Sequence, residues 1–434
     1  MKLILTADLH LGRSSTGLPP SVSARHNATT CREAWERIVN LAVEESAEAV
    51  LVAGDLIEES RAYYESLGTL VDGFKTLQAH GIHFFAVAGN HDARAFERIA
   101  MDCADMEGIN FVGRGGKWQR VAIENDGRKH LFIDGWSFPD HRHPTDPTDT
   151  YDLERNPGAP VIGLLHTDLG NSTSPYAPTT PGALRRLPPD FWLLGHIHKP
   201  SRFDTDGDAT ILYPGSPQAM DFGETGWHGV WELATETMQL RRHQTSTIRY
   251  ENSLQVMLRP DDGEEAVSAA LKEAAMTHIS DLHEDERGAL AAIIHRATLR
   301  GEWKQVDPLE TLTAKLPEFD LPEHEGLKAG FDGRLEDRTE LPLNLENEER
   351  RGGAIGRLAG RLIVLKSDDW EECSWFKEIQ RELMKEYQGC RIEGDDEVRD
   401  DGQSLFGPPT PKDLRGSLAA QARHLLVAAR KEVS

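Results

Sequence analysis

The chain has little cysteine and no long apolar segment. Only four cysteines occur among its 434 residues, and no two of them have the CxxC spacing of a zinc knuckle or suggest a disulfide framework. Residues 2–7 are apolar, but this stretch is too short for a signal peptide and ends at Asp8. No apolar run approaches the length of a transmembrane helix. We therefore expect a cytoplasmic protein with reduced thiols and no membrane partner.

Basic residues are also scarce. The chain has 48 Lys and Arg against 72 Asp and Glu, for a formal net charge of −24. This balance argues against non-specific DNA binding by the free chain, because affinity for the DNA backbone rests on basic residues that neutralise phosphates. A nucleic-acid substrate would need bound metal ions in the cleft or a partner that supplies a basic groove. Five basic residues lie near the motifs below, as phosphate contacts or as ordinary surface charge: Arg13, Arg94, Arg114, Lys117 and Arg120.

What the chain does have is a set of metal-binding residue types that follow short apolar runs. Each run reads as a buried strand, and open α/β sheets place ligands at the carboxyl ends of their strands. The five stretches are Asp8-Leu9-His10, Gly54-Asp55, Gly89-Asn90-His91-Asp92, His166 and Gly195-His196-Ile197-His198. Each alone is weak, since Gly-Asn-His-Asp is also an ordinary turn sequence. All five in this order indicate one metal site.

Carboxylate oxygen and imidazole nitrogen suit hard or borderline divalent ions. Two such ions held ~3.5–4 Å apart can bind a phosphate and generate a hydroxide that attacks it. On these motifs, residues 1–225 resemble the calcineurin-like metallophosphoesterases, and most closely the SbcD-type DNA-repair nucleases. Tyr213-Pro214-Gly215-Ser216-Pro217 adds to this, because it resembles the Tyr-x-Gly-Ser stretch of those nucleases.

The resemblance implies a role for each residue of the site. Asp8, His10 and His198 would hold the first metal ion, and Asn90, His166 and His196 the second. Asp55 would bridge the two. The ions would be Mn²⁺, although the ligand types also suit Fe²⁺ or Zn²⁺. His91 would protonate the leaving oxygen, with Asp92 as its orienting partner; a histidine that titrates near neutrality suits a general acid.

One position departs from part of the family. Many archaeal and eukaryotic members carry a histidine three residues after the bridging aspartate, where this chain has Glu58. An acid there would repel a phosphate backbone unless it faces away or orients a ligand. We expect a solvated side chain, in the pair Glu58-Glu59, and this leaves the handling of duplex ends open.

The resemblance also implies the fold class, an α/β sandwich of two β-sheets flanked by helices. A small α/β capping domain and a helical C-terminal tail would follow. Apolar spacing predicts helices over 33–46 and 63–79. Near residue 250 the pattern changes to a strand, a helix over 264–276 and a strand over 289–300. We predict a nuclease domain over 1–245, a capping domain over 250–340 and a helical region over 341–434. Residues 172–189 read as a loop, either a substrate wall or plain surface.

The C-terminal region offers candidate docking elements. Helices are predicted over 346–365, 370–388 and 411–433, and residues 393–411 read as an acidic, flexible linker. The last helix carries Leu414, Leu418 and Leu425 on one side. It either packs on its own protein or docks a partner. The resemblance implies that partner, an SbcC-like coiled-coil ATPase.

We expect an enzyme that hydrolyses DNA phosphodiesters in DNA repair. The alternatives are a phosphodiesterase or phosphatase for nucleotides or small molecules, or a scaffold for the ATPase with little activity of its own. A protein serine/threonine phosphatase fits less well, because Glu58-Glu59 replaces the usual end of its aspartate motif. Polarity, exo- or endonuclease preference and the oligomeric state, homodimer included, stay open.

Overall fold

The computed structural model divides the chain into two compact units. The first comprises residues 1–257, 263–300 and 305–338, and the second comprises 258–262, 301–304 and 339–434. The predicted boundary between a nuclease and a capping domain, at 245–250, falls inside the first unit and stays a prediction. The structure describes residues 1–23, 30–59, 63–125, 128–153, 159–203, 209–304, 309–319, 321–324, 326–340, 342–390 and 410–431.

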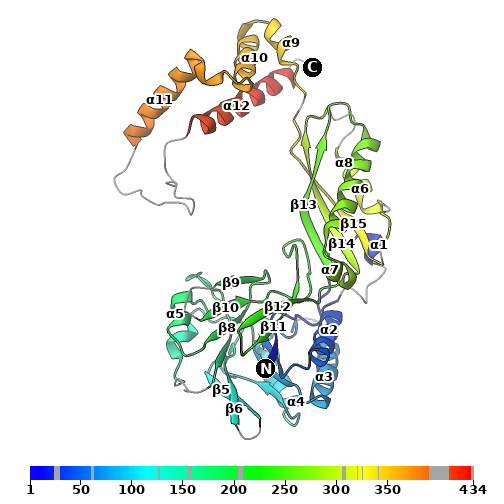
Figure 1. The fold of residues 1–434 in the computed structure, drawn as a ribbon, viewed down its shortest axis with the longest axis vertical. Coiled ribbons are helices and arrows are strands. Elements are labelled where there is room, and N and C mark those ends of the chain that lie inside the picture. The colour runs from blue at the N-terminus through cyan, green and yellow to red at the C-terminus, as the bar shows by residue number, and fades with distance from the viewer. Residues whose placement is uncertain are drawn as a thin grey trace. The chain divides into compact units, whose positions relative to one another are not determined.

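The first unit contains a six-stranded sheet with the order β12-β11-β1-β2-β3-β4. Its strands β11 and β12 are labelled in Figure 1. Strands β1 to β4 are parallel, and β11 and β12 extend the sheet in antiparallel pairing. The strands are β1 (Lys2–Thr6), β2 (Ala49–Ala53), β3 (His83–Val87), β4 (Ile109–Phe111), β11 (Gly229–Ala234) and β12 (Gln239–Gln244).

A second six-stranded sheet has the order β5-β6-β7-β8-β10-β9. Strands β6, β7, β8 and β10 are parallel, and the edge strands β5 and β9 are antiparallel to their neighbours. The strands are β5 (Gln119–Asn125), β6 (Arg128–Trp136), β7 (Val161–His166), β8 (Phe191–Gly195), β9 (Ser201–Phe203) and β10 (Thr210–Tyr213).

The two sheets pack face to face, and alternation along the strands makes this possible. In β2, Leu51 faces the second sheet and packs in one core cluster with Leu164 and Leu193. Val50 and Val52 point the other way, into a second cluster under the helices. Successive side chains of a strand point to opposite faces, so a strand that is apolar throughout is buried on both. The predicted fold class, two sheets flanked by helices, is confirmed.

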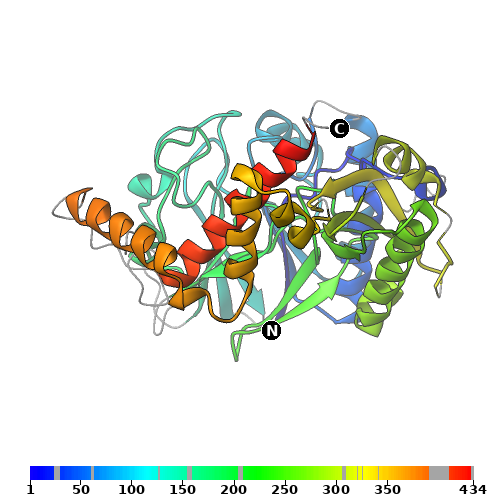
Figure 2. The ribbon, with the colours of Figure 1, turned by 90° about the horizontal axis from the view of Figure 1, so that it is seen from above.

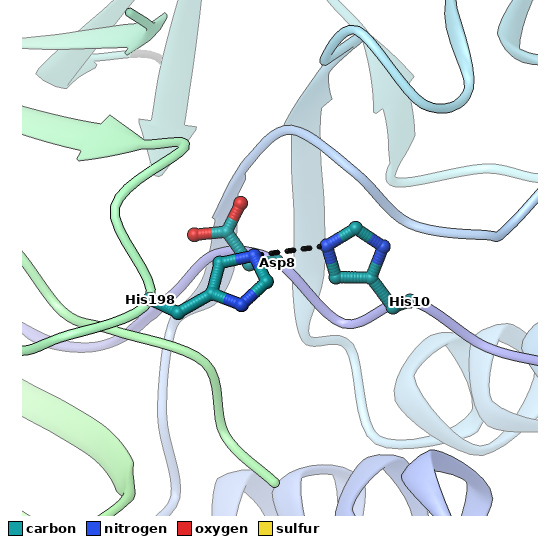
Figure 3. Close-up of side chains that lie close together, drawn as sticks. All are labelled: Asp8, His10 and His198. Carbon is teal, nitrogen blue, oxygen red and sulfur yellow. Dashed lines mark hydrogen bonds between the residues drawn. The ribbon is translucent and has the colours of Figure 1, made fainter. Parts of the chain in front are cut away.

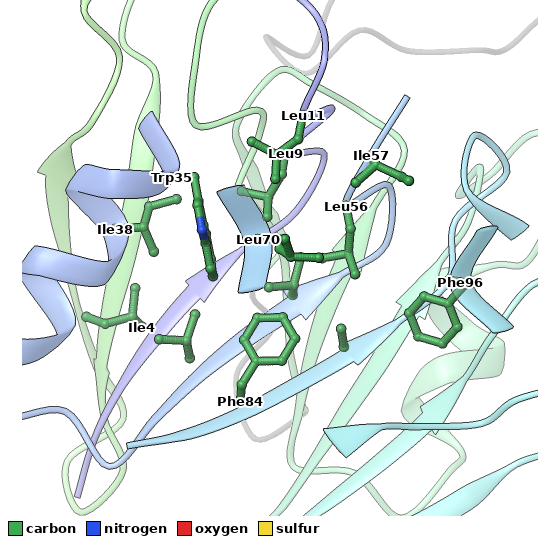
Figure 4. Close-up of a cluster of buried hydrophobic side chains, with 14 of the residues drawn as sticks. Ile4, Leu9, Leu11, Trp35, Ile38, Leu56, Ile57, Leu70, Phe84 and Phe96 are labelled. Atoms are coloured by element: carbon green, nitrogen blue, oxygen red, sulfur yellow. The ribbon is translucent and has the colours of Figure 1, made fainter. Parts of the chain in front are cut away.

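Three helices contribute side chains to that second cluster: α2 (Cys31–Glu44), α3 (Tyr63–Ala79) and α4 (Ala93–Asp102). Trp35 and Ile38 from α2 pack with Leu70 from α3 and Phe96 from α4, over Phe84 of β3 (Figure 4). The first two helices lie where apolar spacing places them. Helix α1 (Pro20–Ser23) and helix α5 (Pro181–Arg185) are short.

A three-stranded sheet, β13-β14-β15, completes the first unit. Helix α6 packs through Val267, Leu271, Ala275 and Ile279, all buried and four residues apart. The predicted strand-helix-strand pattern is present, but Ala289 ends helix α7 rather than starting a strand. The elements are β13 (Ile248–Leu258), α6 (Glu264–Asp281), α7 (Glu284–Ala289), β14 (Ala292–Gly301), α8 (Leu309–Lys315) and β15 (Lys328–Asp337).

The second unit is helical, with α9 (Leu345–Arg350), α10 (Gly353–Lys366), α11 (Ser374–Cys390) and α12 (Pro411–Lys431). The single helix predicted over 346–365 is two helices, because Gly352 and Gly353 have left-handed φ values of 69° and 64°. The predicted linker lies almost wholly in 391–409, outside the described residues.

The terminal helix α12 packs on its own unit (Figure 2). Leu426 joins α10 in one cluster, and Leu414 joins Trp370 and Phe376 in another with Leu418 beside it. Leu425 is 56% exposed. Two of the three leucines offered for docking are therefore used internally. Among the described residues, no helix combines the length and apolarity needed to cross a membrane.

Candidate metal centre

The predicted site residues of the first unit converge where five strands end. Asp8 and His10 follow β1, Asp55 follows β2 and Asn90 follows β3, while His166 ends β7 and His196 and His198 follow β8. The loops after β1 and β2 are paired, since the amides of Asp8 and His10 donate to the carbonyls of Gly54 and Asp55 at 3.0 and 2.9 Å. The two sheets therefore contribute to one site.

One group of donors consists of Asp8, His10 and His198 (Figure 3). A ligand atom of each lies within 4.8 Å of those of the others. The Nε2 atoms of His10 and His198 are only 3.1 Å apart. Asp8 is also fixed from behind, because the His196 amide donates to both of its carboxylate oxygens, at 3.0 and 3.2 Å.

A second group gathers around the side-chain oxygen of Asn90. Asn90 Oδ1 lies 3.0 Å from His166 Nε2 and 3.2 Å from His196 Nδ1. His166 Nδ1 lies 3.0 Å from the carbonyl oxygen of Ala53. If Nδ1 carries the proton and donates it there, the lone pair of Nε2 faces Asn90.

Asp55 lies between the two groups. Its Oδ2 is 3.5 Å from His10 Nε2 and 3.5 Å from His166 Nε2. Its Oδ1 accepts a hydrogen bond from the His91 amide at 2.9 Å. A carboxylate oxygen equidistant from one imidazole of each group has the position that a bridging ligand requires.

His91 stands at the rim of the site, with 43% of its side chain exposed. The carboxylate beside its ring is that of Glu58, 3.3 Å from His91 Nδ1. Glu58 is 13% exposed, so the expectation that it is solvated is wrong. The carboxylate of Asp92 instead accepts the amides of Leu56 at 2.6 Å and Gly89 at 2.8 Å. This geometry makes Asp92 a positioning residue for the two loops, and Glu58 the neighbour of the His91 ring.

The backbone of the site is held in rarely adopted conformations. Asp8, His10, Asp55 and His196 have φ values of 54°, 44°, 54° and 100°. Non-glycine residues in this region cost roughly 1–3 kcal/mol each and persist where surrounding structure imposes them, often at functional sites. The motif glycines permit the close packing behind the ligands, since a Cβ at Gly195 would lie 1.9 Å from the Ala53 carbonyl oxygen.

The charges of the site suit divalent cations. Asp8 and Asp55 are both 1% exposed, and the ion-pairing partners that the structure gives them are histidines. Burial, the largest influence, lowers the pKa of His196 to about 4 and that of His10 well below its usual value, which keeps both rings neutral as ligands must be. Burial alone would raise the pKa of Asp55, but His166 and His10 outweigh it and lower that pKa to about 2. Buried carboxylates, imidazoles and an amide oxygen fit two divalent ions.

Two contacts near the site involve residues that the sequence analysis did not single out. The ring centroids of Tyr176, in the segment 172–189, and His196 are 5.1 Å apart, so this segment reaches the metal centre. Glu224 Oε1 lies 2.7 Å from His198 Nδ1. Glu224 is 26 residues beyond His198 in sequence, and no spacing rule relates the two. Of the five basic residues near the motifs, three are ion-paired: Arg94 with Asp140, Arg114 with Glu97 and Arg120 with Asp134.

Comparison with known proteins agrees with this geometry. A model of the calcineurin-like phosphoesterase family matches residues 1–200. Residues 1–200 are thus similar to the calcineurin-like phosphoesterases. The family implies a metal-dependent hydrolase of phosphate esters, and the region holds all seven residues proposed as ligands.

The relatives differ in how much of this chain they match. YhaO of Bacillus subtilis, an uncharacterized metallophosphoesterase, is 27% identical over 80% of this chain and 84% of its own. The DNA double-strand break repair protein Mre11 of Methanopyrus kandleri is 25% identical over 52% of this chain and 50% of its own, and that of Archaeoglobus fulgidus 26% over 52% of each. The chain thus spans about half the length of the two Mre11 relatives that it matches.

Solved structures show more distant similarity. The protein TT1561 of Thermus thermophilus aligns with a TM-score of 0.35 at 15% identity, over 56% of this chain and 98% of that one. A dimetal phosphatase from Danio rerio aligns with a TM-score of 0.34 at 10% identity, over 54% of this chain and 91% of that one.

Proposed function

We propose that this chain is a two-metal phosphodiester hydrolase that acts on DNA, as an exo- or endonuclease in DNA repair, with Mn²⁺ as its metal. The observation that carries the proposal is the place of Asp55, whose Oδ2 is 3.5 Å from an imidazole of each donor group. Asp8, His10 and His198 would hold one ion, and Asn90, His166 and His196 the other. When bound, the ions supply Lewis acidity and lower the pKa of water at the reaction centre.

The chain's own residues prepare the reacting groups. The backbone conformation at Asp8 and His10 directs both side chains toward His198, so one side of the site is formed before substrate arrives. His91 is the exposed ring at the rim and would deliver a proton to the leaving oxygen. The contact of Glu58 with Nδ1, at 3.3 Å, would limit the ring's rotation, and Nε2 would then be the nitrogen that gives up the proton.

DNA is the substrate class supported by the relatives named for double-strand break repair. The acidity of the chain remains the physical obstacle to DNA binding. Arg94, Arg114 and Arg120 do little to overcome it, because each is already paired with an acidic residue of the chain. A small-molecule phosphodiesterase would need no basic groove. The proposal for DNA therefore includes a partner that holds the duplex.

An SbcC-like coiled-coil ATPase is the proposed partner, docked on the helical region 346–433. Because Leu414 and Leu426 of α12 pack against their own unit, deleting the helix would also expose its cores. A surface substitution is the better test. Leu425→Glu changes an exposed side chain and should abolish co-purification with the ATPase while leaving metal binding intact. Retained binding would move the docking surface to residues 358–383.

The substrate is tested by cleavage assays with Mn²⁺, Mg²⁺ and Zn²⁺ on duplex DNA, single-stranded DNA and bis-p-nitrophenyl phosphate. Hydrolysis of DNA that is strongest with Mn²⁺ supports the proposal. Hydrolysis of the small ester without any DNA cleavage, with and without the ATPase, would favour a small-molecule phosphodiesterase. Asp55→Asn is the control for contaminating nucleases.

A further inference from the structure

Glu224 occupies a buried position behind one of the proposed metal ligands. It lies between β10 and β11 and is 8% exposed. Its Oε1 is 2.7 Å from His198 Nδ1. Its Oε2 accepts hydrogen bonds from the Ser216 hydroxyl at 2.9 Å and the Met220 amide at 3.0 Å. Each carboxylate oxygen therefore faces at least one donor.

The directions of these hydrogen bonds follow from the groups involved. A backbone amide can only donate, so Oε2 must accept from Met220. His228 Nδ1 lies 3.0 Å from both the hydroxyl and the carbonyl oxygen of Ser216. Because that carbonyl can only accept, His228 Nδ1 carries the proton, and the Ser216 hydroxyl can accept it while donating its own to Glu224. The chain His228 to Ser216 to Glu224 thus has one consistent direction.

This direction fixes the proton on His198. With Glu224 ionised and Oε2 occupied, Oε1 accepts from His198 Nδ1–H. In the neutral ring the other nitrogen, Nε2, presents its lone pair to the side where His10 Nε2 lies 3.1 Å away and Asp8 completes the group. A histidine that binds a metal through one nitrogen commonly donates its other N–H to a carboxylate, which sets the ring's tautomer and orientation.

We propose that Glu224 is a positioning residue for His198, held in turn by Ser216 and by the Met220 amide. Its function is to keep the Nε2 lone pair of His198 directed at the first ion. The inference rests on the proposed metal centre and adds to it a residue that no metal ligand pattern in the sequence predicts. Ser216 acquires a role through the same contacts, as the hydroxyl that holds Oε2.

Glu224→Gln is a sharp test because an amide cannot satisfy all these donors. If the Gln oxygen accepts from Met220 and Ser216, its NH₂ faces His198 and forces the ring to accept there, which protonates Nε2. If the Gln is flipped, its NH₂ opposes the Met220 amide. Glu224→Asp keeps the charge but shortens the side chain, so its effect should be intermediate. Ser216→Ala removes one donor and should have a smaller effect than Glu224→Gln.

The experiment is a Mn²⁺ titration of the full metal-free chain by isothermal calorimetry, at one pH. Wild type should bind two ions. Glu224→Gln should weaken one site about 10- to 100-fold and leave the other unchanged. Ser246→Ala is the matched control for Ser216→Ala, since Ser246 is equally buried and its hydroxyl bonds to the backbone of Ala219 and Ile248. It should bind Mn²⁺ as wild type does.

The outcomes separate this inference from the centre on which it rests. Two unchanged sites in Glu224→Gln would overturn the role of Glu224 and leave the metal centre standing. Equal weakening of both sites, with a lower melting temperature of the metal-free chain, would show that Glu224 only stabilises the fold. If Glu224→Gln fails to fold, Glu224→Asp and Ser216→Ala decide by the same criterion. A wild-type chain that binds no Mn²⁺ would overturn the centre and the inference together.

Discussion

The Glu58 carboxylate lies 3.3 Å from Nδ1 of His91 and 3.8 Å from Nδ1 of His10. It thereby lies close to both the ring assigned to proton transfer and a proposed ligand of the first ion. These two rings also meet edge to face, with centroids 4.9 Å apart. The Glu58 carboxylate is thus inside the site, where it faces the rings of His10 and His91.

Replacing Glu58 should therefore impair turnover more than metal binding. In Glu58→Ala the His91 ring loses its nearest carboxylate and becomes free to rotate away from the leaving oxygen. Misplacement of a catalytic group by about 1 Å costs roughly 100-fold. We expect kcat on bis-p-nitrophenyl phosphate to fall about 10- to 100-fold with two Mn²⁺ still bound. Glu59→Ala, the same change one residue along, is the control. A loss of one ion in Glu58→Ala would show that Glu58 supports metal binding and does not act by orienting His91.

His91→Asn should abolish turnover without releasing either metal ion. The ring sits at the rim, and the contact of His91 with Asp55 runs through its backbone amide. Loss of a general acid reduces the rate by roughly 10²–10⁴. Native mass spectrometry measures the metal content beside the rate. A variant that loses a metal ion, or one that retains the wild-type rate, would disprove the assigned role.

Asp55→Asn should weaken metal binding more than the replacement of any other single proposed ligand. Asp55 is assigned to both ions, whereas Asp8 is assigned to the first ion and Asn90 to the second. We expect the titration of Asp55→Asn to show both sites weakened and that of Asp8→Asn to show mainly one. Equal loss of a single site in both variants would mean that Asp55 does not bridge the ions.

Mn²⁺ binding should release about one proton near pH 7. Burial by itself would lower the pKa of His198, but the hydrogen bond to Glu224 and the charge of Asp8 outweigh it and raise the pKa to about 9 without metal. Below that pH the ring carries a second proton, and Glu224 keeps the one on Nδ1, so the proton that leaves is on Nε2. His10 and His196 are already neutral and release none.

Affinity for the first ion should consequently rise about tenfold per pH unit between about pH 6 and 8, since each bound ion displaces one proton. Calorimetry in two buffers of different ionisation enthalpy counts the released protons directly. An affinity that does not change with pH, with no proton released, would show that His198 is neutral before metal binds.

Sequence reasoning located the ligand motifs because each one follows an apolar run, and strand ends are where such residues act. Helix α3 was predicted over its whole length, 63–79, for a similar reason, since Leu70, Phe74 and Leu77 are buried at helical spacing. The residues that connect the motifs were harder to see. Glu58 stands in a Glu-Glu pair that is typical of a surface, and only the pairing of the loops after β1 and β2 brings it inward.

Other features depend on tertiary structure alone. Glu224 is far along the chain from His198, and its loop reaches the site only because β10 and β11 belong to different sheets of the sandwich. Strand β15 was not predicted, because Gly330 and Gly333 interrupt its apolar pattern. The strand is stabilised by its parallel pairing with β14, which the local sequence does not reveal. The sequence of α12 leaves open whether the side that carries Leu414 packs on its own protein or docks a partner, because nothing in it shows that Trp370 and Phe376 lie against Leu414.

The central claim is that Asp55 joins two ions at the end of five strands, and crystals of the wild-type chain grown with Mn²⁺ test it most directly. An anomalous difference map at the manganese edge should show two peaks ~3.5–4 Å apart. One should lie among Asp8, His10 and His198, the other among Asn90, His166 and His196, with Asp55 in contact with both. A single peak, or two peaks of which only one touches Asp55, would contradict the two-metal centre.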